Sequence, residues 1–403
     1  MFIIECMNGK IIQKYSHFPD ENEVLLLPCS YFEVLDKIDQ GNGLRTIHIK
    51  QIQPPVLLIQ PPFFTSPLPV ETANTVPRHA SSTNIDPNVT WNNDQMKSKA
   101  EINKNDLDKA DGHSEIRFEL KSSYDKLVLV GRYWPVPNVN KPNAVVLFVH
   151  GSGEHCQRYR HVAHFFNKHQ IPCVAYDLRG NGLSGGQRGF MPNMDALLDD
   201  LECVIKYIRK DLDFTMPLII YAHGTGCVNC LAHILQRRKS RPDCQAMILS
   251  TPSICLKERP TPLAFFASRV VSSLIPRLPL LISGNYTNEY TDDKEIVEAY
   301  RNDLLVHDKW PAQTISLLLE FGKLLETTVV QFPVPVTIQH GVDDNITPIK
   351  MIQKWAQERV KGDDVMFKSW PGHRHEIHND MGREDVFNYV LEWIEKRFKI
   401  EQH

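Results

Sequence analysis

At residues 144–155 the chain reads Ala-Val-Val-Leu-Phe-Val-His-Gly-Ser-Gly-Glu-His, an apolar run followed directly by a glycine-rich polar segment. A continuous apolar run, without the alternation of a half-exposed strand, is typical of a parallel strand covered on both faces. Comparable runs recur at 172–176, 218–221, 246–250, 334–339 and 365–370, with helical-length segments between them. This alternation predicts an α/β fold with a mostly parallel sheet and helices on both faces.

The segments around these strands complete the expected architecture. Residues 116–118 and 127–134 read as an antiparallel hairpin at the sheet edge. Amphipathic spacing predicts helices through Leu197, Leu201, Val204 and Ile208, and through Phe387, Val390, Leu391, Ile394 and Phe398. In open α/β sheets ligands gather beyond the carboxyl ends of the strands, so the residues that follow each strand are the first candidates for a site.

Two of these strand ends carry long signatures. His150-Gly151-Ser152-Gly153-Glu154-His155 precedes Arg158-Tyr159, and Asp177-Leu178-Arg179-Gly180-Asn181-Gly182-Leu183-Ser184 precedes Gly185-Gly186-Gln187-Arg188-Gly189. Their order and spacing resemble the monoacylglycerol lipase and serine aminopeptidase branch of the α/β-hydrolases, over about Phe118 to Phe398. The chain departs from that pattern at Asn181, where the family usually has His, and at Cys156. The resemblance implies an α/β-hydrolase fold with a cap inserted over the sheet.

The family's nucleophile is a serine in a sharp turn between a strand and a helix. Here the strand at 218–221 leads into Ala222-His223-Gly224-Thr225-Gly226-Cys227, which is similar to the family's Gly-His-Ser-Met-Gly-Gly. His223 and Gly226 align the two segments, so the position of the serine falls on Gly224. The side chain that would attack a substrate is therefore absent.

The resemblance also implies the other members of the site. It assigns the acid to Asp344, rather than Asp343, in the segment after residue 339, and the general base to His375 after the last strand. The expected oxyanion donors are the backbone N–H groups of Ser152 and Thr225. Backbone donors survive side-chain substitution, so the oxyanion hole is expected to persist.

A glycine at the nucleophile position leaves three readings open. The leading one is a retained scaffold that is catalytically impaired, because an acyl-enzyme needs an oxygen or sulfur that His375 can deprotonate. Loss of the serine from such a unit lowers turnover by about a millionfold in other triad enzymes. The other two readings are rescue by Thr225 or Cys227, and attack by a water held by His375 and Asp344.

Residues 252–309 break the strand rhythm and contain an apolar cluster, which includes 263–266, 270–271, 274–275 and 278–282. We interpret this segment as the cap, and the whole of 115–403 as the hydrolase domain. Covering the core is the simpler explanation of its apolarity. A small acyl ester or lipid bound in a cap pocket, and peripheral contact of the cap with a membrane, are the alternatives.

The amino-terminal region has a different character. Residues 1–53 read as strand, turn and strand, and residues 54–114 as a linker rich in Pro, Asn and Ser that we expect to be largely disordered. Residues 15–34 resemble the carboxyl-terminal end of arginine-specific mono-ADP-ribosyltransferases, in which a Glu-x-Glu pair acts on NAD and the acceptor arginine. Glu21 and Glu23 hold those positions. The resemblance covers only about 50 residues, and no NAD-gripping arginine matches, so a remnant is expected rather than a transferase.

Composition restricts the partners. The chain has 403 residues and a formal net charge of -3, so it lacks the basic footprint of a nucleic-acid-binding protein. Its nine cysteines follow no secretory leader, which favours a reduced, cytoplasmic chain. Cys227 and Cys230 form one Cys-x-x-Cys without a second pair, so two buried side chains are expected there and no metal or cofactor is predicted. The sequence as a whole predicts a hydrolase-fold protein of the monoacylglycerol lipase type that is catalytically impaired, either as an inactive hydrolase or as a binder of a lipid or ester.

Overall fold

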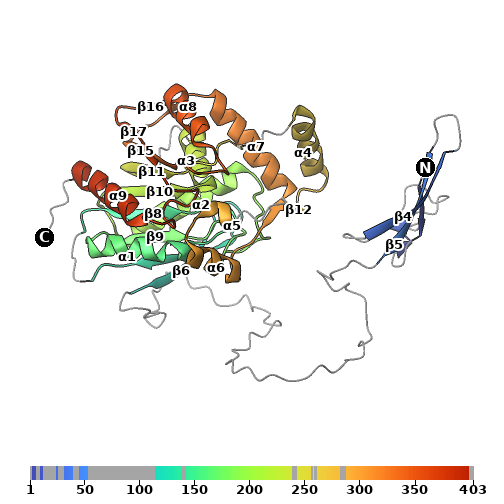
Figure 1. Cartoon of the computed structure of the whole chain (residues 1–403). Helices are drawn as coiled ribbons and strands as arrows, with labels where there is room; N and C mark the ends of the chain where they lie inside the picture. Colours follow the sequence, from blue (N-terminus) through green and yellow to red (C-terminus); the bar gives the residue numbers. More distant parts are fainter. Residues whose placement is uncertain are drawn as a thin grey trace, which may run out of the picture. The chain divides into compact units, whose positions relative to one another are not determined.

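The computed structural model describes residues 114–137, 142–237, 243–255, 257, 261–281 and 287–398, and the backbone of five short strands between Phe2 and Ile52. The chain divides into two compact units, Met1–Asn93 and Asp94–His403 (Figure 1). The expected linker at 54–113 and the pair Glu21 and Glu23 lie outside the described residues.

The first unit contains a small sheet in the order β1-β5-β4. Strand β1 (Phe2–Glu5) is parallel to β5 (Arg45–Ile52), and β5 is antiparallel to β4 (Tyr31–Asp39). Strands β2 (Lys10–Ile11) and β3 (Val24–Leu25) form a separate antiparallel pair. The strand–turn–strand expectation for residues 1–53 therefore has a counterpart in β4 and β5.

The second unit is built on an eight-stranded sheet in the order β17-β15-β11-β10-β8-β9-β7-β6. The members of this sheet are β6 (Ile116–Lys121), β7 (Val128–Trp134), β8 (Val145–Val149), β9 (Cys173–Tyr176), β10 (Leu218–His223), β11 (Ala246–Ser250), β15 (Val336–Gly341) and β17 (Val365–Trp370). Strand β7 is antiparallel to both of its neighbours, and the other adjacent strands are parallel. The α/β fold with an antiparallel edge hairpin is thus confirmed.

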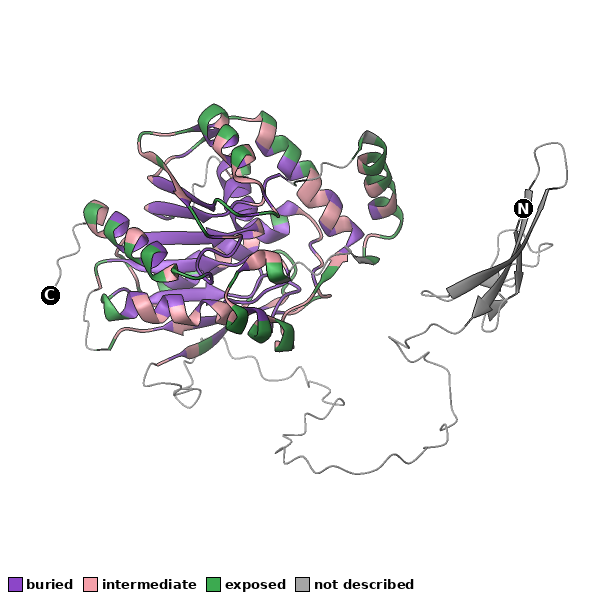
Figure 2. Cartoon of the chain, viewed as in Figure 1, coloured by how far each residue is buried: buried purple, intermediate pink, exposed green. Residues whose placement is uncertain are grey.

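Two cores lie on opposite faces of this sheet, because successive side chains of a strand point in opposite directions. Along β8, Val145, Leu147 and Val149 pack on one face, and Val146 and Phe148 pack on the other. The first face is covered by α2 (Met194–Lys206), α3 (Thr225–Gln236), α7 (Ala312–Thr327) and α8 (Ile349–Arg359). The second face is covered by α1 (Arg160–Lys168) and α9 (Arg383–Phe398). Figure 2 shows the strands between these helices as buried.

The segment between β11 and β15 holds the elements expected of an insertion. After β11 come α4 (Pro262–Leu274), β12 (Pro279–Leu281), α5 (Thr287–Tyr290), α6 (Lys294–Asn302), β13 (Lys309–Pro311) and α7. Strands β12 and β13 pair antiparallel, and α4 packs against α7. Strand β14 (Val330–Gln331) follows α7 and pairs in parallel with β16 (Val360–Lys361), and the other short elements are η2 (Cys156–Tyr159) and η3 (Tyr207–Asp211).

Candidate active site

Gly224 forms the bend between β10 and α3. Its backbone has φ 54° and ψ -120°, a left-handed conformation that glycine adopts without the steric penalty of a β-carbon. Its N–H donates to the carbonyl of Ser250 at 3.0 Å, and its carbonyl accepts from the N–H of Ser253 at 3.1 Å. The bend is therefore held from the end of the neighbouring strand β11.

The space beside Gly224 is large enough for a small side chain. A β-carbon added there would lie 3.6 Å from His375 Nε2, 3.6 Å from Ser253 Oγ and 3.7 Å from the α-carbon of Gly151. All three distances are ordinary van der Waals contacts, and two of the neighbours are polar. A side chain at this position would thus point at the imidazole of His375.

His375 and Asp344 form a buried pair. Nδ1 of His375 lies 2.8 Å from Oδ2 of Asp344, and Oδ1 of Asp344 accepts the N–H groups of Ile346 at 2.8 Å and Thr347 at 3.0 Å. A second histidine, His340, places its Nε2 3.3 Å from Oδ2 of Asp344. These contacts fix the carboxylate on one side of the imidazole and leave Nε2 of His375 facing Gly224.

The electrostatics of this pair suit a general base. Burial opposes the charged form of His375, but the adjacent Asp344 carboxylate outweighs burial and raises the pKa of the imidazole above its ordinary 6.5. Burial likewise opposes ionisation of Asp344, yet His375 and the hydrogen bonds from His340 and His375 hold its pKa well below 3.8. Asp344 is therefore an anion that orients His375 and stabilises its protonated form.

Ser152 and Thr225 lie on the opposite side of the bend. Thr225 is the first residue of α3, and its Oγ1 lies 2.8 Å from Oγ of Ser152. Among the described residues, the backbone N–H groups of both residues have no acceptor. The N-terminus of a helix also carries partial positive charge. The expected oxyanion donors are therefore brought together, with a pair of linked hydroxyl groups that the sequence analysis did not foresee.

Cys227 is placed away from this space. Its thiol is buried and donates to the carbonyl oxygen of Ala222 at 3.2 Å, on the core side of the bend. Burial raises the pKa of the Cys227 thiol well above 9.0, so a thiolate is disfavoured. Cys230 is also buried, and no cluster of three or more potential metal ligands occurs within the described ranges.

Ser253 is a site residue that sequence reasoning missed. It follows β11, and its hydroxyl flanks the position of a Gly224 β-carbon as closely as His375 does. Its side chain is half-buried. The rule that site residues follow the carboxyl ends of strands could have pointed to it, had the end of β11 been read as the other strand ends were.

The two departures from the family pattern lie where the loop after β8 meets the loop after β9. Oδ1 of Asn181 accepts the N–H of Gly153 at 3.1 Å and lies 3.0 Å from Nε2 of His307. The N–H of Cys156 donates to Oδ1 of Asp177 at 2.8 Å. Both residues therefore tie the loop after β8 to the loop after β9.

An ion-pair network centred on Arg158 joins two loops of the site. Arg158 donates to both carboxylate oxygens of Glu376, at 2.8 and 2.7 Å, and to Glu154 at 3.0 Å. Glu376 follows His375, whereas Glu154 accepts the N–H of Gly151 at 2.6 Å. The guanidinium thus joins the loop that carries His375 to the loop that carries Ser152.

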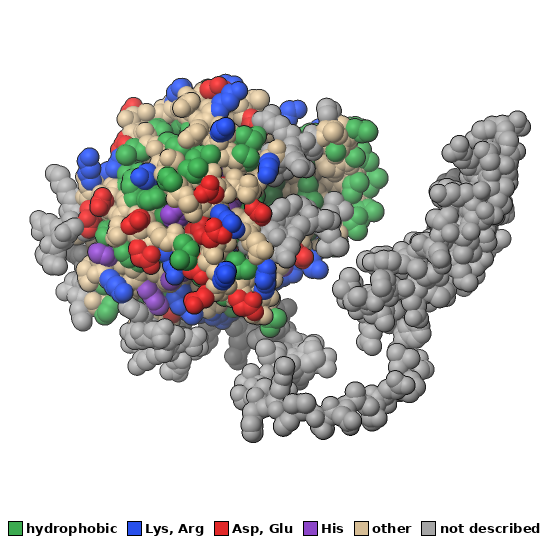
Figure 3. All heavy atoms as spheres, viewed as in Figure 1, with side chains coloured by type: hydrophobic (Ala, Val, Ile, Leu, Met, Phe, Trp, Pro, Cys, Tyr) green, Lys and Arg blue, Asp and Glu red, His purple; other side chains and the backbone are tan. Residues whose placement is uncertain are grey.

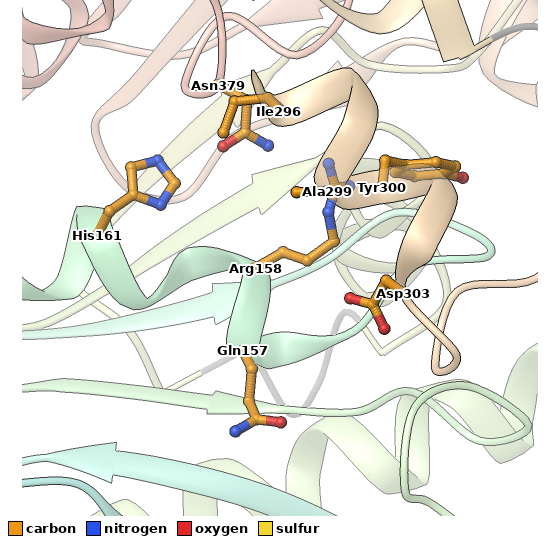
Figure 4. A pocket seen from close by; sticks show the side chains of 8 residues that line it. All are labelled: Gln157, Arg158, His161, Ile296, Ala299, Tyr300, Asp303 and Asn379. Carbon is orange, nitrogen blue, oxygen red and sulfur yellow. The ribbon is translucent and has the colours of Figure 1, made fainter. Parts of the chain in front are cut away.

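A cavity of about 200 Å³ adjoins this network (Figure 4). Arg158 and Tyr300 lie close together in it, with the guanidinium carbon 4.7 Å from the centre of the tyrosine ring. The side chains that line it are Gln157, Arg158, His161, Ile296, Ala299, Tyr300, Asp303 and Asn379. Neither Gly224 nor His375 lines this cavity.

Helix α4 exposes a set of large apolar side chains. The exposed fractions of Leu263, Phe266 and Leu274 are 76%, 64% and 74%. Figure 3 shows hydrophobic side chains gathered over this helix. Among the described residues, no helix combines the length and apolarity needed to cross a membrane. The apolarity of the inserted segment is thus presented outward at α4 and does not only cover the core.

Comparison with known proteins adds the family context. Residues 140–382 match the family model described as serine aminopeptidase, S33. A monoacylglycerol lipase of Mycolicibacterium smegmatis is 28% identical over 254 residues, which cover 63% of this chain and 88% of that protein. An abhydrolase domain-containing protein of Dictyostelium discoideum is 30% identical over 275 residues, which cover 68% of this chain but 28% of that longer protein.

A solved structure shares the fold. A soluble variant of monoglyceride lipase from Saccharomyces cerevisiae, in complex with a substrate analogue, superimposes with a TM-score of 0.59 at 22% identity. The match covers 68% of this chain and 93% of that one. At this identity the likeness shows the fold alone.

Proposed function

Because the chain belongs to the serine aminopeptidase S33 family of α/β-hydrolases, we propose that it binds a small acyl ester or lipid of the monoacylglycerol type without the family's serine-dependent hydrolysis. The family context supports an acyl ligand, since curated relatives include monoacylglycerol lipases. The substituted bend supports the loss of turnover. The protein is thus proposed to be a binding protein on a hydrolase scaffold.

One observation carries this proposal. The acid and base, Asp344 and His375, lie 2.8 Å apart, and Nε2 of the base faces a position where the chain has a hydrogen in place of a hydroxymethyl group. The base therefore has no side-chain oxygen at residue 224 to deprotonate. Without that oxygen the acyl-enzyme of a serine hydrolase cannot form at this residue.

The test is covalent labelling with a fluorophosphonate probe, which reacts with activated serines. We expect no labelling of the wild-type protein and labelling of Gly224→Ser, because the added Oγ fits the space and reaches His375. The labelled residue is identified by peptide mass spectrometry. Gly224→Ala is the matched control, since it fills the same space without a hydroxyl group.

Labelling of the wild-type protein would contradict the proposal and would favour the reading in which another residue attacks. The mapped residue would then identify the nucleophile, with Ser253 and Thr225 as the hydroxyl groups nearest the bend. A water route leaves no label, so hydrolysis of an activated ester is measured in parallel. Turnover by the wild type that equals that of Gly224→Ser would also overturn the proposal.

We also propose that α4 is the element through which the protein contacts lipid. Its support is the outward set of Leu263, Phe266 and Leu274, because exposed apolar patches of this kind mark protein or membrane contacts. Contact with a lipid surface would place the inserted segment next to the source of an acyl ligand. Cosedimentation with lipid vesicles tests this contact.

A further inference from the structure

We propose that the replacement of serine by Gly224 turns the acyl-transfer site into a carboxylate-binding site, whose ligand is the anion of an aliphatic carboxylic acid rather than an ester. The inference rests on the proposed function for the acyl chain of the ligand, and it adds the chemical class of the headgroup. It is argued from the two places where the carboxylate oxygens would bind.

The first oxygen has its donors where the start of α3 meets the loop after β8. The N–H groups of Ser152 and Thr225 have no acceptor within the described ranges, and their hydroxyl groups are linked at 2.8 Å. Helix α3 has 12 residues, so its N-terminus adds the partial positive charge of a full helix dipole. Two backbone donors at a helix N-terminus form a ready site for an anionic oxygen.

The second oxygen has its place beside Gly224. A β-carbon there would be 3.6 Å from both His375 Nε2 and Ser253 Oγ, so the space accepts a small group that has two polar neighbours. His375 is only 6% exposed, its Nδ1 is engaged by Asp344, and its Nε2 has no partner among the described residues. In a serine enzyme the side chain of the nucleophile occupies part of this space.

A carboxylate suits this pair of places better than an ester. With one oxygen at the two N–H groups, the other can accept from a protonated His375 and from the Ser253 hydroxyl. Hydrogen bonds between charged partners are roughly twice as strong as those between neutral ones. An ester offers only a neutral oxygen at the second place, and that oxygen also carries an alkyl group toward His375 and Ser253.

The charges around His375 allow it to be the cation of this site. Titratable groups from several elements lie around His375 or influence its charge. They are His340 in β15, Asp344 after β15, His223 in β10, Tyr290 in α5, Glu154 after β8, and Glu376, the next residue in the chain. Burial lowers the pKa of His223 to about 4, so that histidine is neutral. Glu154 and Glu376 are both paired with Arg158, which reduces their repulsion of an anion.

The experiment is isothermal titration of the full chain with decanoate, methyl decanoate and decanol. We expect decanoate to bind the wild type at least about tenfold more tightly than either neutral probe at about pH 6. We expect the affinity for decanoate to fall at about pH 9, because His375 must carry a proton on Nε2 to donate a hydrogen bond to the carboxylate. Binding of the neutral probes stays unchanged between the two pH values.

Two variants test the placement of the oxygens. Gly224→Ala fills the second place with a methyl group. We expect it to lower the affinity for decanoate at least about tenfold, while the affinity for methyl decanoate changes by less than about twofold. His375→Gln leaves the backbone of the bend unchanged and removes the imidazolium cation. We expect the same loss of affinity for decanoate. His373→Gln is the matched control, because His373 contacts Trp370 and the carbonyl of Pro371.

Equal affinity of the wild type for decanoate and methyl decanoate, or decanoate binding that neither Gly224→Ala nor His375→Gln weakens, would overturn the inference. Those results would leave the proposed function intact, since a neutral acyl ligand would still be bound without turnover. Fluorophosphonate labelling of the wild type has the opposite meaning. It would overturn the proposed function whichever probe binds more tightly.

Discussion

At the scale of single residues, the site combines a complete acid–base pair with a glycine at the bend. Asp344 holds its anionic form beside His375, and His375 directs Nε2 at residue 224. An ordinary triad enzyme would use this arrangement to deprotonate a serine. Asp344 and His375 keep the geometry of a general-base pair, but residue 224 has no hydroxyl group that His375 could deprotonate.

A serine restored at this bend should show the raised pKa of His375 in its pH profile. The base must be neutral to accept the proton, so kcat/KM of Gly224→Ser for an activated ester should rise with pH and reach half its maximum above pH 6.5. Asp344→Asn in the same background removes the carboxylate that raises this pKa. We expect kcat to fall roughly 10⁴-fold, by analogy with other triads.

The measurement is the initial rate across a pH series with both variants. A profile of Gly224→Ser with its midpoint below pH 6.5 would contradict the raised pKa of His375. An Asp344→Asn variant with unchanged kcat would show that the carboxylate does not position the base.

At the scale of elements, the site depends on helices and strands whose ends are held by local contacts. Helix α2 starts after Asn193, whose side-chain oxygen accepts the N–H of Ala196 at 2.9 Å. The helix packs its apolar face, including Leu197 and Leu201, on the same face of the sheet as α3. Buried Arg179, which follows β9, donates to Asp200 on α2 at 2.7 Å. These contacts anchor the loop after β9 beside the site.

Loss of the Asn193 cap should lower the free energy of unfolding. We expect Asn193→Ala to reduce the free energy of unfolding by about 1 kcal/mol, because the N–H of Ala196 loses its acceptor. Urea unfolding followed by circular dichroism measures the change. Asn193→Asp is the matched control, since a carboxylate oxygen still accepts at the cap. Equal stability of Asn193→Ala and the wild type would show that the cap contributes nothing.

At the scale of the whole hydrolase unit, distant parts of the chain are brought to one edge of the sheet. Ser152 and Thr225, which are 73 residues apart, share a hydrogen bond, and Arg158 and Glu376 are 218 residues apart. The inserted segment adds α4, whose exposed apolar side chains lie far in sequence from the residues of the bend. The proposed roles in ligand binding and lipid contact therefore belong to different elements of the same unit.

The lipid contact can be tested with vesicles of phosphatidylcholine. Replacement of Leu263, Phe266 and Leu274 together by Ser should weaken cosedimentation at least about tenfold, because these side chains would be buried in the bilayer interface. The matched control replaces Val329, Val342 and Met366 by Ser, since these residues are also exposed and apolar but lie elsewhere. Equal loss in both triple variants, or no binding by the wild type, would refute the proposal for α4.

Much of the fold and part of the candidate site could be predicted from local patterns. The apolar runs at 246–250 and 365–370 coincide with β11 and β17, and the hairpin at the sheet edge is β6 and β7. Strand β10 extends beyond the predicted residue 221 to His223, because pairing with β11 continues through the polar end of the run. Element ends depend on neighbours in space, so local patterns predict them less well.

The amino-acid sequence by itself determined that residue 224 has no side chain and that it stands where a strand passes into a helix, because strand and helix periodicity are local properties of the chain. Only the tertiary structure decided that Ser253 flanks the same space, that the hydroxyl groups of Ser152 and Thr225 are linked, and that the apolar side chains of α4 face outward. Those facts depend on which surfaces pack together across long sequence separations. Packing is a property of the folded molecule as a whole, and no spacing along the chain encodes it.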